Sequence, residues 1–168
     1  MKKLICFIIS CALTFSLFFN ASAQVSELKF PGTEVFITPP EHFELTKDEN
    51  GNDFLYHSGT KAIIQLQSRN DISYKQSINS ITPEYFSEQN MVLLMAQNPS
   101  MPDGSEASLY ICSARYHSDQ QESLSAYTVL IFIGGNETRS FFATARFPDQ
   151  VKDLLMNEIL NSLFSIRF

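Results

Sequence analysis

The sequence predicts an α+β fold in which an antiparallel sheet of about six or seven strands carries helices on both faces, an α/β/α sandwich. Short apolar runs are separated by tight turns, and such turns join antiparallel neighbours. The run from Thr128 to Ile133 is apolar throughout, which indicates a strand covered on both sides. Apolar residues recur at helical spacing over 150–164, which predicts a closing amphipathic helix.

Residues 1–23 are typical of a secretory signal peptide. Lys2 and Lys3 precede an apolar run that ends in the small residues Ala21, Ser22 and Ala23. This run is shorter than the ~20 residues that a membrane-spanning helix needs, so cleavage after Ala23 is preferred over a retained anchor. The sequence therefore predicts export to the periplasm or the extracellular space, with no transmembrane segment after cleavage.

A lipoprotein anchored through Cys11 is the alternative to a freely exported protein. Ile8, Ile9 and Ser10 precede Cys11 and fit a lipoprotein cleavage box loosely. The apolar core continues past Cys11 to Phe19, however, where a lipoprotein would already turn polar. We rank this alternative second.

The remaining chain, residues 24–168, has the length and charge of one acidic domain. Removal of 23 of the 168 residues leaves 145, enough for a core without disulfide staples. All eighteen acidic residues remain while two of twelve basic ones are lost, which gives a formal charge of −8. Binding of nucleic acid or anionic lipid needs clustered Lys and Arg, so neither is expected as a partner.

The first half of the domain, which begins near Glu34, is predicted to form strands and one helix. A strand from Glu34 to Thr38 must stop at the prolines that follow. The pair Asn50-Gly51 is a strong hairpin signal between residues 43–58, and another strand follows over 61–68. Thr82 is a good N-cap for a helix that begins at Pro83 and ends near Gln89.

The second half is predicted to be mostly strand. Strands are expected over 91–97, 106–117, 125–133 and 138–147, with a loop over 98–105 and a turn at Gly134-Gly135. The last two strands form a hairpin in the middle of the core, so Phe132, Phe141 and Phe142 should be buried between sheet and helices.

Several segments resemble the PsbP-like, Mog-type superfamily of small secreted or lumenal domains. They are "PPEHFEL", "KAIIQLQ", "EQNMVLL", "PDGSEASLY", "FFATARFP" and "EILNSLFSI", which together span nearly the whole mature chain. The resemblance implies an α/β/α sandwich whose members mostly act by docking onto another protein. It offers no agreed active site to transfer. The expectation is an exported, non-enzymatic domain without a cofactor that binds a protein partner or supports an envelope assembly.

The loop from Asn98 to Glu106 is the predicted partner-binding segment. Pro99 and Pro102 stiffen its backbone, and Met101 between them has no periodic place on either neighbouring strand. Met101 is therefore expected to point outward as a flexible apolar anchor on a preorganised loop.

A small metal-binding protein or hydrolase of the envelope is the alternative function. It would use His57, His117 and nearby carboxylates such as Asp53 and Asp119, brought together in three dimensions. No H-x-x-x-H or H-E-x-x-H pattern supports it.

Two further features of the sequence allow a chemical or a structural interpretation. The segment Asp48 to Asp53 invites a calcium interpretation, but its spacing fails the EF-hand pattern and a solvated hairpin turn is preferred. Cys112 is the one cysteine left after cleavage and lies in an apolar strand, so a buried, unreactive thiol is expected.

Overall fold

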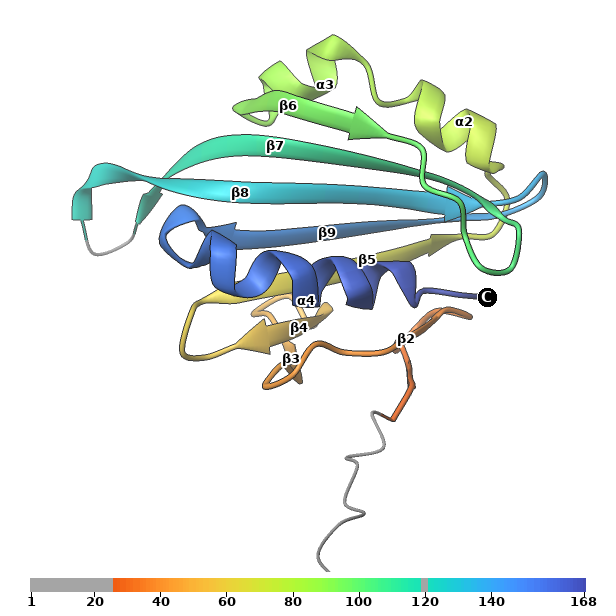
Figure 1. The fold of residues 1–168 in the computed structure, drawn as a ribbon, viewed down its shortest axis with the longest axis horizontal. Helices are drawn as coiled ribbons and strands as arrows, with labels where there is room; N and C mark the ends of the chain where they lie inside the picture. The colour runs from red at the N-terminus through yellow and green to blue at the C-terminus, as the bar shows by residue number, and fades with distance from the viewer. Residues whose placement is uncertain (1–25, 119–120) are drawn as a thin grey trace, which may run out of the picture.

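The protein forms a seven-stranded antiparallel sheet, as the sequence predicts (Figure 1). The computed structural model describes residues 26–118 and 121–168, with backbone only at 117, 118 and 121–123. The strand order is β3-β4-β5-β9-β8-β7-β6, and a separate pair is formed by β1 (Leu28–Lys29) and β2 (Phe36–Ile37). The sheet strands are β3 (Glu44–Lys47), β4 (Asp53–His57), β5 (Ala62–Arg69), β6 (Met91–Gln97), β7 (Glu106–Ser118), β8 (Gln121–Gly135) and β9 (Ser140–Pro148).

Helices cover both faces of this sheet, because its strands are apolar on both sides. The helix α4 (Lys152–Phe164), preceded by a 3-10 turn over Asp149–Val151, packs Leu155, Ile159 and Leu163 against one face. On the other face, α2 (Tyr74–Asn79) and α3 (Pro83–Glu88) contribute Tyr74 and Phe86 to a second core. The predicted sandwich is therefore confirmed.

The two helical layers cover different halves of the sheet. Figure 1 shows α4 in front of β9 and β5 and α3 beside β6, and α2 contacts β7, β8 and the start of β9. In the described part of the chain, two half-faces carry little helix cover. One is the α4 side of β6, and the other is the α2 and α3 side of β5 and of β9 beyond Ser140.

The β8-β9 hairpin is the centre of the core, as expected. Phe132 and Phe141 are fully buried on the α4 side. Phe142 corrects the prediction, because it points to the other face and is only partly buried beside the second core. The turn also differs: Gly134 and Gly135 belong to β8, and the chain reverses over 136–139.

Two elements were not predicted. The helix α2 begins at a capping box in which Ser73 accepts from the Gln76 N–H and Gln76 Oε1 accepts from the Ser73 N–H. That S-x-x-Q spacing is a sequence signal that could have found the helix. Strand β1 is the second, and it shows that the fold begins before Glu34; it pairs with β2, which lies within the strand predicted from Glu34 to Thr38 and is bridged to Arg167 through Phe36.

The other predicted elements are confirmed. The hairpin around Asn50-Gly51 joins β3 to β4, and α3 begins at Pro83 with the Thr82 hydroxyl accepting from the Tyr85 N–H. The predicted signal peptide and its alternative at Cys11 lie outside the described residues. Among the helices of residues 26–118 and 121–168, none has the length and apolarity to cross a bilayer.

Candidate functional site

Strand β6 exposes four consecutive large apolar side chains at the edge of the sheet. Val92, Leu93, Leu94 and Met95 are 64, 41, 56 and 47% exposed. β6 is the last strand in the sheet order, so its outer edge pairs with no strand of the described chain. Sheet edges present free N–H and C=O groups that can template another strand.

The register of β6 on β7 distributes these side chains over both faces. Val92 pairs with Ser113 and Met95 with Ile111, which places both on the α4 side. Leu93 pairs with Cys112, whose side chain belongs to the second core. A β-bulge between Leu93 and Met95 leaves Leu94 outside the regular pairing. The edge strand is thus apolar on both faces.

A shallow hollow of about 630 Å³ continues this apolar surface on the α4 side. Val92, Leu124 and Ala126 line it, and Leu124 is itself about half exposed. Asp149, at the start of the 3-10 turn, lies in its wall and accepts a 2.7 Å hydrogen bond from the Thr128 hydroxyl. We call Val92, Leu93, Leu94, Met95 and Leu124 the β6 surface.

The β6 surface was missed at the level of sequence. The segment "MVLLMA" has the continuous apolar composition of a central strand, which is covered on both faces. The topology places it at an edge, where a strand of this composition is unusual. Only the strand order reveals this mismatch.

The predicted partner-binding loop is packed differently from the prediction. Met101 is only 6% exposed and belongs to the core on the α4 side, so the expected outward orientation is wrong. The loop is held by Asn98, whose Oδ1 accepts a 2.7 Å hydrogen bond from Ser108 Oγ. Pro99 is half-buried and Pro102 is exposed. A partner-binding role for these two prolines stays a prediction.

The histidine residues named for a metal or hydrolase site are not brought together with carboxylates in the described part of the chain. The His57 ring packs edge-on against Phe43, and its Nδ1 accepts from the Thr60 N–H at 3.2 Å. The side chain of His117 and the whole of Asp119 lie outside the part of the chain that the structure describes. Among the described residues, no group of three His, Cys, Asp or Glu side chains is placed to hold a metal ion.

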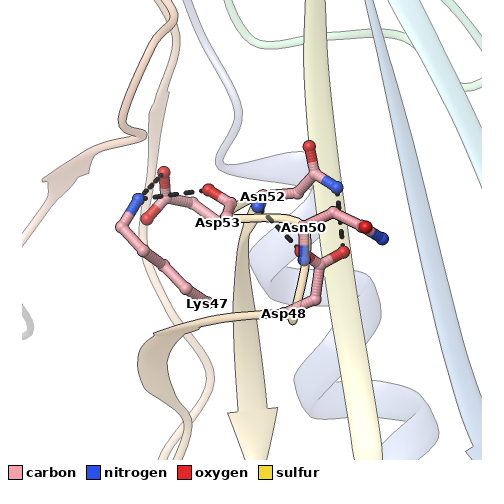
Figure 2. Close-up of polar contacts among 6 residues, drawn as sticks. Lys47, Asp48, Asn50, Asn52 and Asp53 are labelled. Carbon is pink, nitrogen blue, oxygen red and sulfur yellow. Dashed lines mark hydrogen bonds and ion pairs between the residues drawn. The ribbon is translucent and has the colours of Figure 1, made fainter.

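The acidic hairpin tip is organised by its own hydrogen bonds (Figure 2). Asp48 Oδ1 accepts from the backbone N–H groups of Asn50 and Asn52 at 2.9 and 2.8 Å, and Asp48 Oδ2 accepts from the Asn52 amide. These bonds, the Asn52 side chain first, hold the pKa of Asp48 below its usual value. Asp53 forms an ion pair with Lys47 at 2.8 Å. The preferred hairpin interpretation accounts for these carboxylates.

Cys112 lies on β7 with no exposed surface. Burial raises the pKa of its thiol to about 11. A thiol needs its thiolate form to act as a nucleophile, so this position is chemically quiet near neutral pH.

No protein-family model and no curated protein matches the chain by sequence. Solved structures do resemble it. Cyanobacterial PsbP (CyanoP) from Synechocystis sp. PCC 6803 aligns with a TM-score of 0.59 at 6% identity, over 84% of this chain and 91% of that one. LpqN, involved in cell envelope biogenesis of Mycobacterium tuberculosis, aligns with a TM-score of 0.54 at 10% identity. The alignment covers 84% of this chain and 88% of LpqN.

A protein from Bacteroides thetaiotaomicron VPI-5482 aligns with a TM-score of 0.54 at 11% identity. The alignment covers 86% of this chain and 48% of that protein, so the chain spans about half of its length. Identities this low show the fold alone. The PsbP-like fold implied by the sequence resemblance is confirmed by these structures.

Proposed function

We propose that residues 24–168 form a single exported, non-enzymatic domain that binds a partner protein of the cell envelope through the β6 surface. The observation that carries this proposal is the row of exposed apolar side chains from Val92 to Met95 on the terminal strand of the sheet. The occupant is an extended segment of the partner, which adds to the sheet as a further strand. Main-chain hydrogen bonds would supply affinity and the apolar side chains would supply specificity.

The composition of β6 supports a strand partner over a solvated edge. Natural edge strands are usually protected by charges, prolines or bulges. β6 has the bulge at Leu94 but carries no charged residue between Met91 and Gln97. A strand with apolar side chains on both faces becomes similar to a central strand once a neighbour pairs with its edge.

The fold gives independent support for a docking role in the envelope. LpqN, one of the similar structures, is involved in cell envelope biogenesis, and CyanoP is a cyanobacterial PsbP. The N-terminal sequence is typical of an exported protein, whether cleaved after Ala23 or anchored through Cys11.

Site-specific photo-cross-linking in the native host tests the docking surface. A photoreactive phenylalanine analogue is placed at Val92 and, as a matched control, at Leu154 of α4, because both side chains are 64% exposed. A third position, Pro102, tests the loop predicted from sequence. We expect a discrete cross-linked partner from position 92 and none from position 154.

Substitution provides the second arm of this test. Here the photoreactive residue is placed at Leu94, which is 56% exposed, so that positions 92 and 95 can be changed. The double variant Val92→Lys and Met95→Lys should abolish the cross-link from position 94, with a thermal midpoint close to that of the wild type because both side chains are exposed. Cross-links from 154 as strong as those from 92 would contradict the proposal. A cross-link from 102 alone would move the docking surface to the loop, and one to a second copy would make β6 a dimer interface.

A further inference from the structure

A groove of about 530 Å³ lies on the opposite side of the sheet from Val92 and Met95. Its floor is the half-face of β5 and β9 that α2 and α3 leave uncovered, and its wall is the α2-α3 segment with Ser80, Ile81 and Tyr85. This volume is in the range of small-molecule sites, which are typically 300–1,000 Å³. The groove takes no part in the β6 surface.

Two arginines line this groove, and each is stacked on aromatic rings. The Arg69 guanidinium lies 5.1 Å from the centroid of Phe142. The Arg146 guanidinium lies 5.2 Å from Tyr116 and 5.8 Å from Tyr127. Among the described residues, neither guanidinium forms an ion pair, and no Asp or Glu lines the groove. In a chain with a formal charge of −6, this is a local concentration of uncompensated positive charge.

The pairing of β5 with β9 sets the two arginines at the two ends of the groove floor. Arg146 pairs with Ile63, whereas Arg69 pairs with Ser140, six residues further along β5. At about 3.3 Å per residue the two backbone positions are ~20 Å apart. Between them the floor is mostly polar, since Gln65 pairs with Thr144 and Gln67 with Phe142.

The inner wall of the groove is apolar and aromatic. Met91, Val129 and Ile131 from the second core lie at its base. Tyr85 is half-buried beside them, and its burial raises the pKa of the phenol while the charge of Arg69 acts in the opposite direction. Tyr85 therefore offers a neutral hydroxyl donor within the field of Arg69.

We propose that this groove binds an organic anion, a carboxylate or phosphate that carries an apolar chain or ring. The stacked guanidinium group at one end of the groove would receive the anionic head, and the partly exposed side chains of Ile63, Ile81 and Phe142 would contact the apolar body. An arginine that stacks on an aromatic ring keeps the N–H donors of its planar edge available to a carboxylate or phosphate. Stacking also fixes the side chain before the ligand arrives, which reduces the entropy lost on binding.

The ligand needs an anionic head because the groove carries arginines, and it needs an apolar body because the groove has an apolar wall. A bare inorganic anion would leave the apolar wall uncovered, and a neutral hydrocarbon would leave two guanidinium groups without a counter-charge. An anion with an apolar body contacts the apolar wall and supplies a counter-charge to the guanidinium group at one end of the groove. The same chemistry occurs in a free amphiphilic acid and in the headgroup region of an anionic lipid.

Displacement of a fluorescent probe tests the proposal on the folded domain, residues 24–168. Anilinonaphthalene sulfonate, an aromatic anion, is bound first, and dodecanoate or dodecyl phosphate is added below its micellar concentration. We expect both to displace the probe, whereas dodecyl maltoside, which has the same chain without the charge, and inorganic phosphate, which has no chain, do not. Equal displacement by dodecyl maltoside, or none by dodecanoate, would overturn the proposal.

Substitution of the two groove arginines by uncharged glutamine tests whether the ligand binds in the groove. Either Arg69→Gln or Arg146→Gln, according to which end of the groove holds the carboxylate, should weaken dodecanoate about tenfold, as expected for the loss of a charge-assisted hydrogen bond, and no weakening by either variant would contradict the proposal. Arg139→Gln is the matched control, because Arg139 also stacks on an aromatic ring, Phe168 at 4.3 Å, but does not line the groove. Equal weakening by all three would contradict a site in the groove.

Two further measurements separate the sources of the ligand and guard against unfolded variants. In the wild type, dodecanoate should shift the side-chain Nε–H resonance of Arg69 or of Arg146, whichever holds the carboxylate, and leave that of Arg139 unchanged, which requires no substitution. Flotation with phosphatidylglycerol vesicles forms the lipid arm. Binding to vesicles without binding of the monomeric acids would assign the groove to a membrane surface and overturn a small-ligand site.

Discussion

The ring of Phe141 occupies the space beside Gly134 that any larger residue would fill. The two residues pair across β8 and β9, and a Cβ placed on Gly134 would lie 2.4 Å from Phe141 Cζ. An aromatic side chain that lies over a cross-strand glycine fills the space that the missing side chain would leave. Gly134 is therefore a packing residue within the strand.

We expect Gly134→Ala to destabilise the domain by ~1–3 kcal/mol, because the added methyl group overpacks the core against Phe141. The free energy of unfolding from a urea titration measures this. The double variant with Phe141→Leu should lose less stability than the sum of the two single variants, since the smaller side chain relieves the clash. Simple additivity would contradict the packing relationship.

The central position of Phe132 predicts a large loss on truncation. Phe132 is fully buried and its ring lies 5.6 Å from those of both Phe141 and Phe164. Phe132→Ala should cost ~3–5 kcal/mol of unfolding free energy. Phe54 on β4 is only partly buried, so Phe54→Ala should cost clearly less. A loss below ~1 kcal/mol at Phe132 would place the ring outside the core.

Met101 is now expected to matter for stability. Met101→Ala should lower the unfolding free energy by ~2–5 kcal/mol, the usual range for a buried methionine. Met95 provides the matched control, since it is the same residue type at 47% exposure, and Met95→Ala should stay within ~0.5 kcal/mol. Equal effects of the two substitutions would show that the loop does not close over the core.

Cys112 should be unreactive in the folded protein. Its thiol has no exposed surface and a pKa of about 11, so little thiolate forms at pH 8 and reagents cannot reach it. Labelling with a maleimide should be at least a hundredfold slower in buffer than in denaturant, as followed by intact mass. Comparable rates in the two conditions would contradict burial of β7.

The hairpin tip should loosen in acid. The pKa of Asp48 is lowered by its bonds to Asn52 and Asn50, so the order they provide is present above the unfolded value of 3.8. This order is lost as the pH falls through the lower, folded value. The amide resonances of Asn50 and Asn52 should therefore move toward random-coil positions only below pH 3.8. In Asp48→Ala these amides should show no such transition.

Local signals in the sequence were sufficient for most of the fold. The Asn50-Gly51 turn, the Thr82 cap before Pro83 and the apolar spacing of the last helix each depend on neighbours within a few residues. Such short-range rules predict where elements begin and end, and the β8-β9 hairpin followed from them. The helix α2 carried an equally local signal, the capping box from Ser73 to Gln76, which the prediction did not use.

The sequence by itself determined the α+β class, the antiparallel connections and the buried character of the central hairpin, because hydrophobic period and turn chemistry are properties of adjacent residues. Only the tertiary structure decided that β6 lies at an edge, that Met101 turns inward, and that Arg69 and Arg146 share one groove. These facts depend on strand order and on how far each helix reaches across the sheet. They bring together residues far apart in the chain, and no periodicity within a segment encodes which strand becomes its neighbour.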